Sequence, residues 1–183
     1  RMSRGLGDVY KRQNYYGVTA LMARVYLCQE NLTDALACAQ EVIDSKRFEF
    51  MNDSINNVYA YRNLSYIEKM ARHEYVSSLY VYDLKEGRSD LFFKNLASCE
   101  CVIAEGRKAS IYSGMGQDLD IRSKNWFETP AGSATEYVNK YMRGTQIPLL
   151  KLSEMYLIAA EGWMEDDPGH AAELLQTFKQ ART

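Results

Sequence analysis

The sequence lacks the patterns that mark several classes of protein. It has only 3 prolines and 11 glycines in 183 residues, which excludes a collagen-like chain or one made mostly of linkers. Its longest apolar run, Met155–Ala160, is far shorter than the roughly 20 residues of a membrane-spanning helix. The net charge is −2 with no block of basic residues. A nucleic-acid-binding groove therefore has no electrostatic support, and we expect no nucleic-acid partner.

The chemistry-bearing residues are also sparse. The two histidines, His73 and His170, have no partner at the spacing of a metal site or a catalytic triad. The four cysteines fit no zinc pattern. Glu154 and Glu161 share one helix face about two turns apart, and we interpret them as structural hydrogen-bond partners. The sequence thus predicts no enzyme, no catalytic residue, no metal and no cofactor.

What is present fits an ordinary globular chain of about one domain. Hydrophobic residues make up 46% and charged residues 25%, which argues against disorder. Residues 1–13 have no helical or strand period and resemble translated adapter sequence. We interpret residues 1–13 as a non-native segment that packs poorly, and residues 14–183 as the domain. The alternative is a native basic loop.

Apolar residues at three- and four-residue intervals predict two helical hairpins. The first joins helices 15–29 and 33–45, with Thr33 as the cap of the second helix and Cys28 and Cys38 as small core residues. Alanines occur where the backbones must approach closely, as in tetratricopeptide-like hairpins.

The second predicted hairpin joins helices 148–164 and 170–181. Pro148 suits the first turn of a helix, because its missing N–H would have no partner there. No glycine cap or tail closes the last helix, so we expect a domain that is truncated at both ends.

The middle of the chain, about residues 46–146, is less regular. Residues 74–82 are rich in Val and Tyr and suggest a strand, although a helix start is the alternative. Residues 91–104 suggest a helix. Residues 112–145 carry four glycines and Pro130, which predicts long loops, and binding groups tend to lie on loops.

Several segments resemble signatures of the SusD/RagB family of outer-membrane nutrient-uptake lipoproteins. The most specific is Ile147-Pro-Leu-Leu-Lys-Leu-Ser-Glu-Met-Tyr-Leu-Ile-Ala-Ala-Glu161, and Asn14–Leu27 is similar to a second signature. Weaker landmarks follow in the family's order: Asp120-Ile-Arg122, Lys140-Tyr141, Leu175-Gln176, Lys179 and Ala181-Arg182. Two departures are Lys151, where the family usually has arginine, and Gln176, where it has asparagine.

The resemblance implies a mainly α fold, a SusD-like α-α superhelix of tetratricopeptide-like hairpins with long irregular loops. It implies a non-catalytic protein that binds glycans or peptides and passes them to a SusC-like, TonB-dependent outer-membrane channel. The expected location is the cell surface of a Gram-negative bacterium. There the full-length protein would be held in the outer membrane by a lipid anchor that residues 1–183 do not carry.

The glycine-rich loops are where we expect the ligand. Aromatic faces stack on sugar rings while polar side chains bond the hydroxyls, which selects five candidates: Tyr112, Gln117, Asp118, Asn125 and Trp126. Alternatives remain for several of them. Trp126 fits the core as well, Asp118 with Asp120 could bind calcium, and Asp120 with Arg122 forms either a ligand clamp or an ion pair that fixes the loop.

Two other functions compete with nutrient capture. A tetratricopeptide scaffold that binds proteins would show repeats of about 34 residues throughout, whereas about a hundred irregular residues separate the two hairpins here. A glycosidase would need an isolated pair of acidic residues in the loops, and the sequence offers none.

Overall fold

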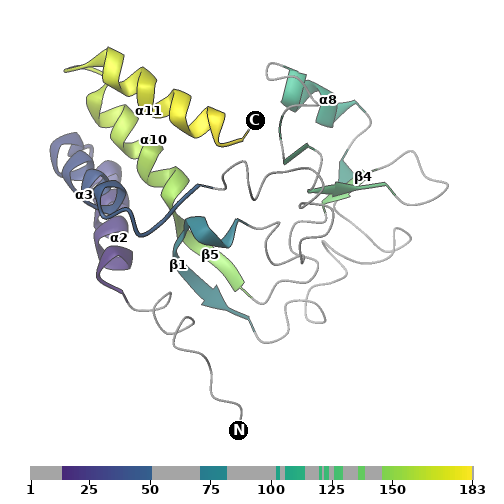
Figure 1. The fold of residues 1–183 in the computed structure, drawn as a ribbon, viewed down its shortest axis with the longest axis horizontal. Coiled ribbons are helices and arrows are strands. Elements are labelled where there is room, and N and C mark those ends of the chain that lie inside the picture. The colour runs from purple at the N-terminus through teal and green to yellow at the C-terminus, as the bar shows by residue number, and fades with distance from the viewer. Residues whose placement is uncertain are drawn as a thin grey trace, which may run out of the picture. The chain divides into compact units, whose positions relative to one another are not determined.

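The computed structural model (Figure 1) describes residues 14–50, 71–81, 102–103, 106–113, 120, 122–123, 126–129, 136–138 and 146–182. Backbone contacts divide the chain into two units. The helical unit comprises Arg1–Met51, His73–Leu79 and Ile147–Ala181, and the middle unit comprises Asn52–Arg72, Tyr80–Gln146 and Arg182–Thr183. Residues 1–13 lie outside the described residues, so the prediction that they pack poorly is not tested.

The first hairpin consists of α2 (Tyr15–Cys28) and α3 (Leu32–Asp44), which confirms the predicted helices to within a residue at each end. The cap of α3 differs from the prediction. The side chain of Asn31, not that of Thr33, accepts the backbone N–H of Asp34, with a donor–acceptor distance of 3.3 Å. Asparagine is an equally good cap, and it stands one residue before the helix begins.

The second hairpin consists of α10 (Leu152–Trp163) and α11 (Pro168–Gln180). The prediction that the first helix begins at Pro148 is wrong, because residues 146–151 form strand β5 (Gln146–Lys151), which pairs with β1 (Tyr75–Tyr80). A proline without an N–H suits the edge of a small sheet as well as a helix start. The proline at a helix start is Pro168, where Asp167 caps α11 by accepting the N–H of His170 at 3.0 Å.

Strand β1 confirms the strand interpretation of residues 74–82. A single 3₁₀ turn, η2 (Arg72–Glu74), precedes the strand. The segment Tyr75–Tyr80 buries its first two residues completely. It therefore contributes to the core of the helical unit as well as to the sheet.

Small residues allow the helices of this unit to pack closely. In Figure 1, α10 lies beside α3 and α11. The core contains six alanines together with larger residues such as Val42, Met155 and Ile158. The prediction that both helix cysteines are core residues is wrong for Cys28, which is exposed, while Cys38 is half-buried. Burial raises the pKa of the Cys38 thiol.

The described residues of the middle unit form one short helix and a small sheet. Helix α8 spans Arg107–Tyr112, and strands β2 (Val102–Ile103), β4 (Glu136–Val138) and β3 (Phe127–Glu128) form an antiparallel sheet in that order. The predicted helix 91–104 is wrong at residues 102–103, and residues 91–100 lie outside the described part. The predicted loop 112–145 contains β3 and β4, where aromatic and β-branched residues favour strands.

Asn14 links the first hairpin to the sheet, and its loss should weaken the fold. Its Oδ1 caps α2 by accepting the N–H of Gly17 at 2.5 Å, and its Nδ2 donates to the Val76 carbonyl of β1 at 3.0 Å. We expect Asn14→Ala to lower the free energy of unfolding by about 1–2 kcal/mol. Urea denaturation followed by circular dichroism would measure it. The matched control, Asn31→Ala, removes an exposed cap with no such link and should cost less; an equal loss would contradict the role of the Val76 bond.

Candidate functional site

An ion pair organises the predicted ligand region. Asp120 is fully buried, and its carboxylate accepts the backbone N–H of Arg122 at 2.8 Å, Nε at 3.0 Å and Nη2 at 2.6 Å. Such charge-assisted, forked pairs fix the geometry of both partners. The pair therefore acts within its own turn, which supports the loop-fixing interpretation of these two residues over the ligand clamp.

Two aromatic rings contact the same guanidinium. The Arg122 Cζ lies 5.8 Å from the centre of the Tyr112 ring and 6.0 Å from that of Trp126. The backbone N–H of Trp126 donates to the Arg122 carbonyl at 3.0 Å. Tyr112 also meets Phe127 edge to face, with ring centres 6.0 Å apart. The structure thus brings two of the five predicted site residues, Tyr112 and Trp126, to one place.

The two aromatic candidates differ in accessibility. Tyr112 ends α8 and is only 8% exposed, so in this conformation its ring does not offer the open stacking face that we expected. Burial raises the pKa of its hydroxyl, and the nearby Arg122 charge offsets this only in part. Trp126 is half-buried and keeps part of its surface accessible. The described residues do not include Gln117, Asp118 or Asn125. The hypothesis that Asp118 binds calcium is therefore not tested.

A second charged pair borders this cluster and was not predicted. Lys108 of α8 contacts Glu136 of β4, with Nζ 2.8 Å from Oε1, and its Nζ lies 5.1 Å from the centre of the Phe127 ring. The two residues are 28 positions apart. Only the pairing of β4 with β3 brings Glu136 close to Phe127, and no local sequence signal reveals it.

The helical unit contains its own ion pairs, which are structural. Arg24 of α2 donates to Glu154 of α10 through Nε at 2.5 Å and Nη2 at 2.7 Å, and to the Leu149 carbonyl at 2.7 Å. The Glu154 carboxylate raises the pKa of the Arg24 guanidinium. These contacts confirm the interpretation of Glu154 as a structural hydrogen-bond partner. Glu161 is exposed.

Lys151 and Glu74 form a more deeply buried pair. Lys151 Nζ lies 3.3 Å from Glu74 Oε2, and the two side chains are 18% and 0% exposed. Lys151 Nζ also lies 5.7 Å from the centre of the Tyr75 ring. Lys151 is the residue at which the segment 147–161 departs from the signature that it resembles, and in this chain it supplies the charge opposite a buried carboxylate.

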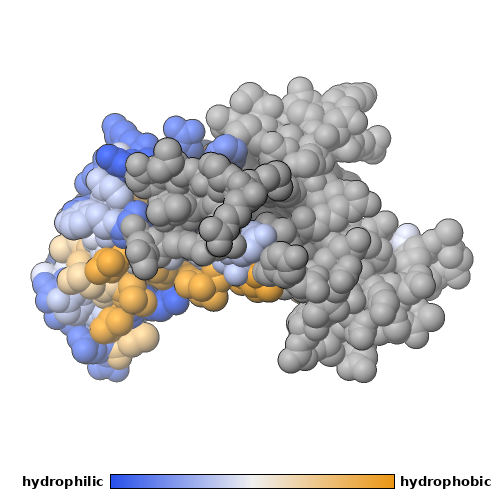
Figure 2. Space-filling view, turned by 90° about the horizontal axis from the view of Figure 1, so that it is seen from below, coloured by the Kyte–Doolittle hydropathy of each residue, from blue (hydrophilic) through white to orange (hydrophobic). Residues whose placement is uncertain are grey.

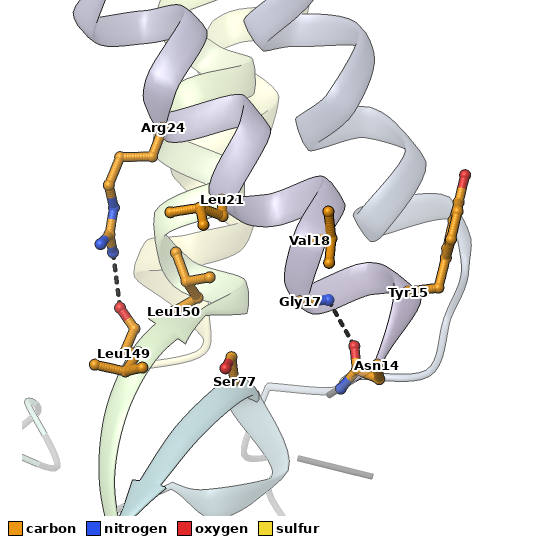
Figure 3. Close-up of a pocket in the computed structure, with 9 residues that line it drawn as sticks. All are labelled: Asn14, Tyr15, Gly17, Val18, Leu21, Arg24, Ser77, Leu149 and Leu150. Atoms are coloured by element: carbon orange, nitrogen blue, oxygen red, sulfur yellow. Dashed lines mark hydrogen bonds between the residues drawn. The ribbon is translucent and has the colours of Figure 1, made fainter. Parts of the chain in front are cut away.

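An apolar groove lies between α2 and β5 in the helical unit. Its volume is about 590 Å³ and its lining includes Val18 and Leu21 of α2 and Leu149 and Leu150 of β5, as Figure 3 shows. Helix α2 exposes further large hydrophobic side chains, among them Met22 and Val25. Figure 2 shows hydrophobic residues gathered on one face of this unit. Exposed apolar patches of this kind mark interaction surfaces.

A second apolar groove of about 390 Å³ lies between α10 and α11. Among the described residues, no group of three or more His, Cys, Asp or Glu side chains is placed to hold a metal ion. None of the described helices is long and apolar enough to cross a membrane.

Comparison with solved structures assigns the fold. The chain resembles a SusD superfamily protein of Bacteroides thetaiotaomicron, with a TM-score of 0.63 and 18% identity over 93% of this chain and 41% of the other. A SusD superfamily protein of Bacteroides vulgatus gives a TM-score of 0.62 and 20% identity, and the match covers 100% of this chain and 43% of the other. Another protein of that bacterium, described as sugar binding, gives a TM-score of 0.64 and 23% identity, and the match covers 93% of this chain and 39% of the other.

The chain therefore has a SusD-like fold, which is mainly helical, as the sequence predicted. It spans about two-fifths of the length of these structures. No protein-family model and no curated protein matches the sequence.

Proposed function

We infer that the chain is part of a non-catalytic protein that binds glycans for nutrient uptake. The observation that carries the proposal is the SusD-like fold, which the chain shares with a structure described as a sugar binding protein. The signature-like segment 147–161 contributes β5 and α10 of that fold. A second observation agrees: the loop region holds an accessible tryptophan beside a fixed ion pair.

The ligand site is proposed within residues 110–132, which begin at the end of α8 and include β3. Trp126 is the main stacking face, because it is half-buried while Tyr112 is buried. An indole can cover the apolar C–H face of a sugar ring while its edge remains polar. Gln117, Asp118 and Asn125 are proposed to bond the hydroxyls. Tyr112 then supports the site from within the core and does not touch the ligand.

The proposed partner is a SusC-like, TonB-dependent outer-membrane channel that receives the captured glycan or peptide. The full-length protein would be held at the cell surface by a lipid anchor. The support for both is the resemblance of residues 14–27 and 147–161 to the family's signatures. The competing function, a tetratricopeptide-type scaffold for protein partners, is favoured by the apolar groove between α2 and β5.

Removing the stacking face should weaken binding and leave the fold intact. We expect Trp126→Ala to reduce glycan affinity by about 1–3 kcal/mol, the scale of burying one large apolar side chain. Affinity would be measured by calorimetry with oligosaccharides selected on an array of neutral plant and microbial glycans. Trp163→Phe alters the other tryptophan, on α10, and serves as the matched control. Equal affinity of Trp126→Ala and the parent protein would remove Trp126 from the site.

A further inference from the structure

Trp126 is attached to a short, two-residue strand, so the backbone alone does little to fix its ring. It immediately precedes β3 (Phe127–Glu128). One contact of its ring is with the Arg122 guanidinium, whose Cζ lies 6.0 Å from the ring centre. Arg122 lies four positions before Trp126, and the Arg122 backbone carbonyl also accepts a hydrogen bond from the Trp126 backbone N–H. One residue therefore contacts both the backbone and the ring of Trp126.

Arg122 can act in this way only if it is itself immobile. Its Nε and Nη2 are bound to Asp120, whose side chain is fully buried, while the Arg122 side chain is 26% exposed. A planar guanidinium held by two bonds to one carboxylate has little rotational freedom. The faces of the guanidinium can then contact aromatic rings. The centre of the Tyr112 ring lies 5.8 Å from the Arg122 Cζ.

We propose that Arg122 is a positioning residue, which orients the Trp126 indole as a stacking face through an ion pair with buried Asp120. The proposal rests on the proposed function for the ligand, but the orientation of Trp126 is a property of the free protein. Arg122 does not contact the sugar in this account. It reduces the freedom that the indole would otherwise lose on binding, and preorganisation of this kind improves affinity.

The test uses the fluorescence of Trp126, which becomes the sole tryptophan when Trp163 is replaced by phenylalanine. In that background, Arg122→Met should increase acrylamide quenching and lower the emission anisotropy. Affinity for the selected neutral oligosaccharide should fall about two- to fivefold, the factor that corresponds to one half-exposed cation–aromatic contact. Arg122→Lys keeps the charge but loses the forked pair, so it should give intermediate values.

The chain supplies a closely matched control in Lys108→Met. Lys108 also pairs with a carboxylate and lies over an aromatic ring, but the pair is with Glu136 and the ring is Phe127. The Lys108→Met variant should leave the acrylamide quenching of Trp126 fluorescence unchanged. Circular dichroism would confirm that each variant is folded, and if Arg122→Met does not fold, Arg122→Lys decides the question.

Unchanged quenching and anisotropy in a folded Arg122 variant would overturn the proposal. So would an equal change in Lys108→Met, because the effect would then be a general loosening of the unit. If the parent protein binds no glycan on the array, the proposed function fails while the fluorescence result still decides the role of Arg122.

Discussion

Replacing Lys151 by alanine is expected to lower the free energy of unfolding by about 3–5 kcal/mol, the cost of removing one partner from a buried ion pair. Glu74 is completely buried, and Lys151 Nζ lies 3.3 Å from its Oε2. Alanine would leave a carboxylate without this cation in a setting that disfavours charge. Urea denaturation followed by circular dichroism at neutral pH would measure the loss.

Two further variants show whether the charge or the bulk of the side chain matters. Lys151→Arg restores both the charge and the residue usual at this position of the family signature, so most of the stability should return. Lys179→Ala removes a lysine from the exposed surface of α11 and should change stability by less than about 0.5 kcal/mol. A loss below about 1 kcal/mol in Lys151→Ala would contradict the importance of the pair.

Local patterns in the sequence predicted the helices well because helix formation depends on neighbours three and four residues apart. This explains why α2 and α3 were found to within a residue. It also explains the failure at Pro148, since proline is compatible with a helix start and with an edge strand. Only the pairing of β5 with β1, about 70 residues earlier, decides between them.

The candidate site shows the same division between local and distant contacts. Asp120 and Arg122 are two residues apart, so their pairing could be anticipated as an ion pair that fixes the loop. The burial of Tyr112 could not, because it depends on contact with Phe127 of β3. The pairing of Lys151 with Glu74 depends likewise on strands that are distant in sequence.

Helices α10 and α3 approach each other closely at Gly162 of α10. A Cβ built there would stand 2.8 Å from the Leu36 Cβ of α3 and 3.5 Å from the Leu32 carbonyl oxygen. Real Cβ atoms do not approach each other to 2.8 Å, and a Cβ moves only with its backbone. The glycine thus costs helix propensity, about 1 kcal/mol relative to alanine, but it allows α10 and α3 to pack together.

We expect Gly162→Val to lower the free energy of unfolding by about 2–3 kcal/mol, since added volume in a packed interface forces backbones apart. Gly162→Ala should fall between valine and the parent, because its gain in propensity offsets part of the clash. The matched control is Ala172→Val on α11, where the same kind of side chain is added at an exposed helix position. It carries the propensity cost of valine without the clash. If Gly162→Ala proved more stable than the parent, α10 and α3 would not be in the close contact that the structure shows.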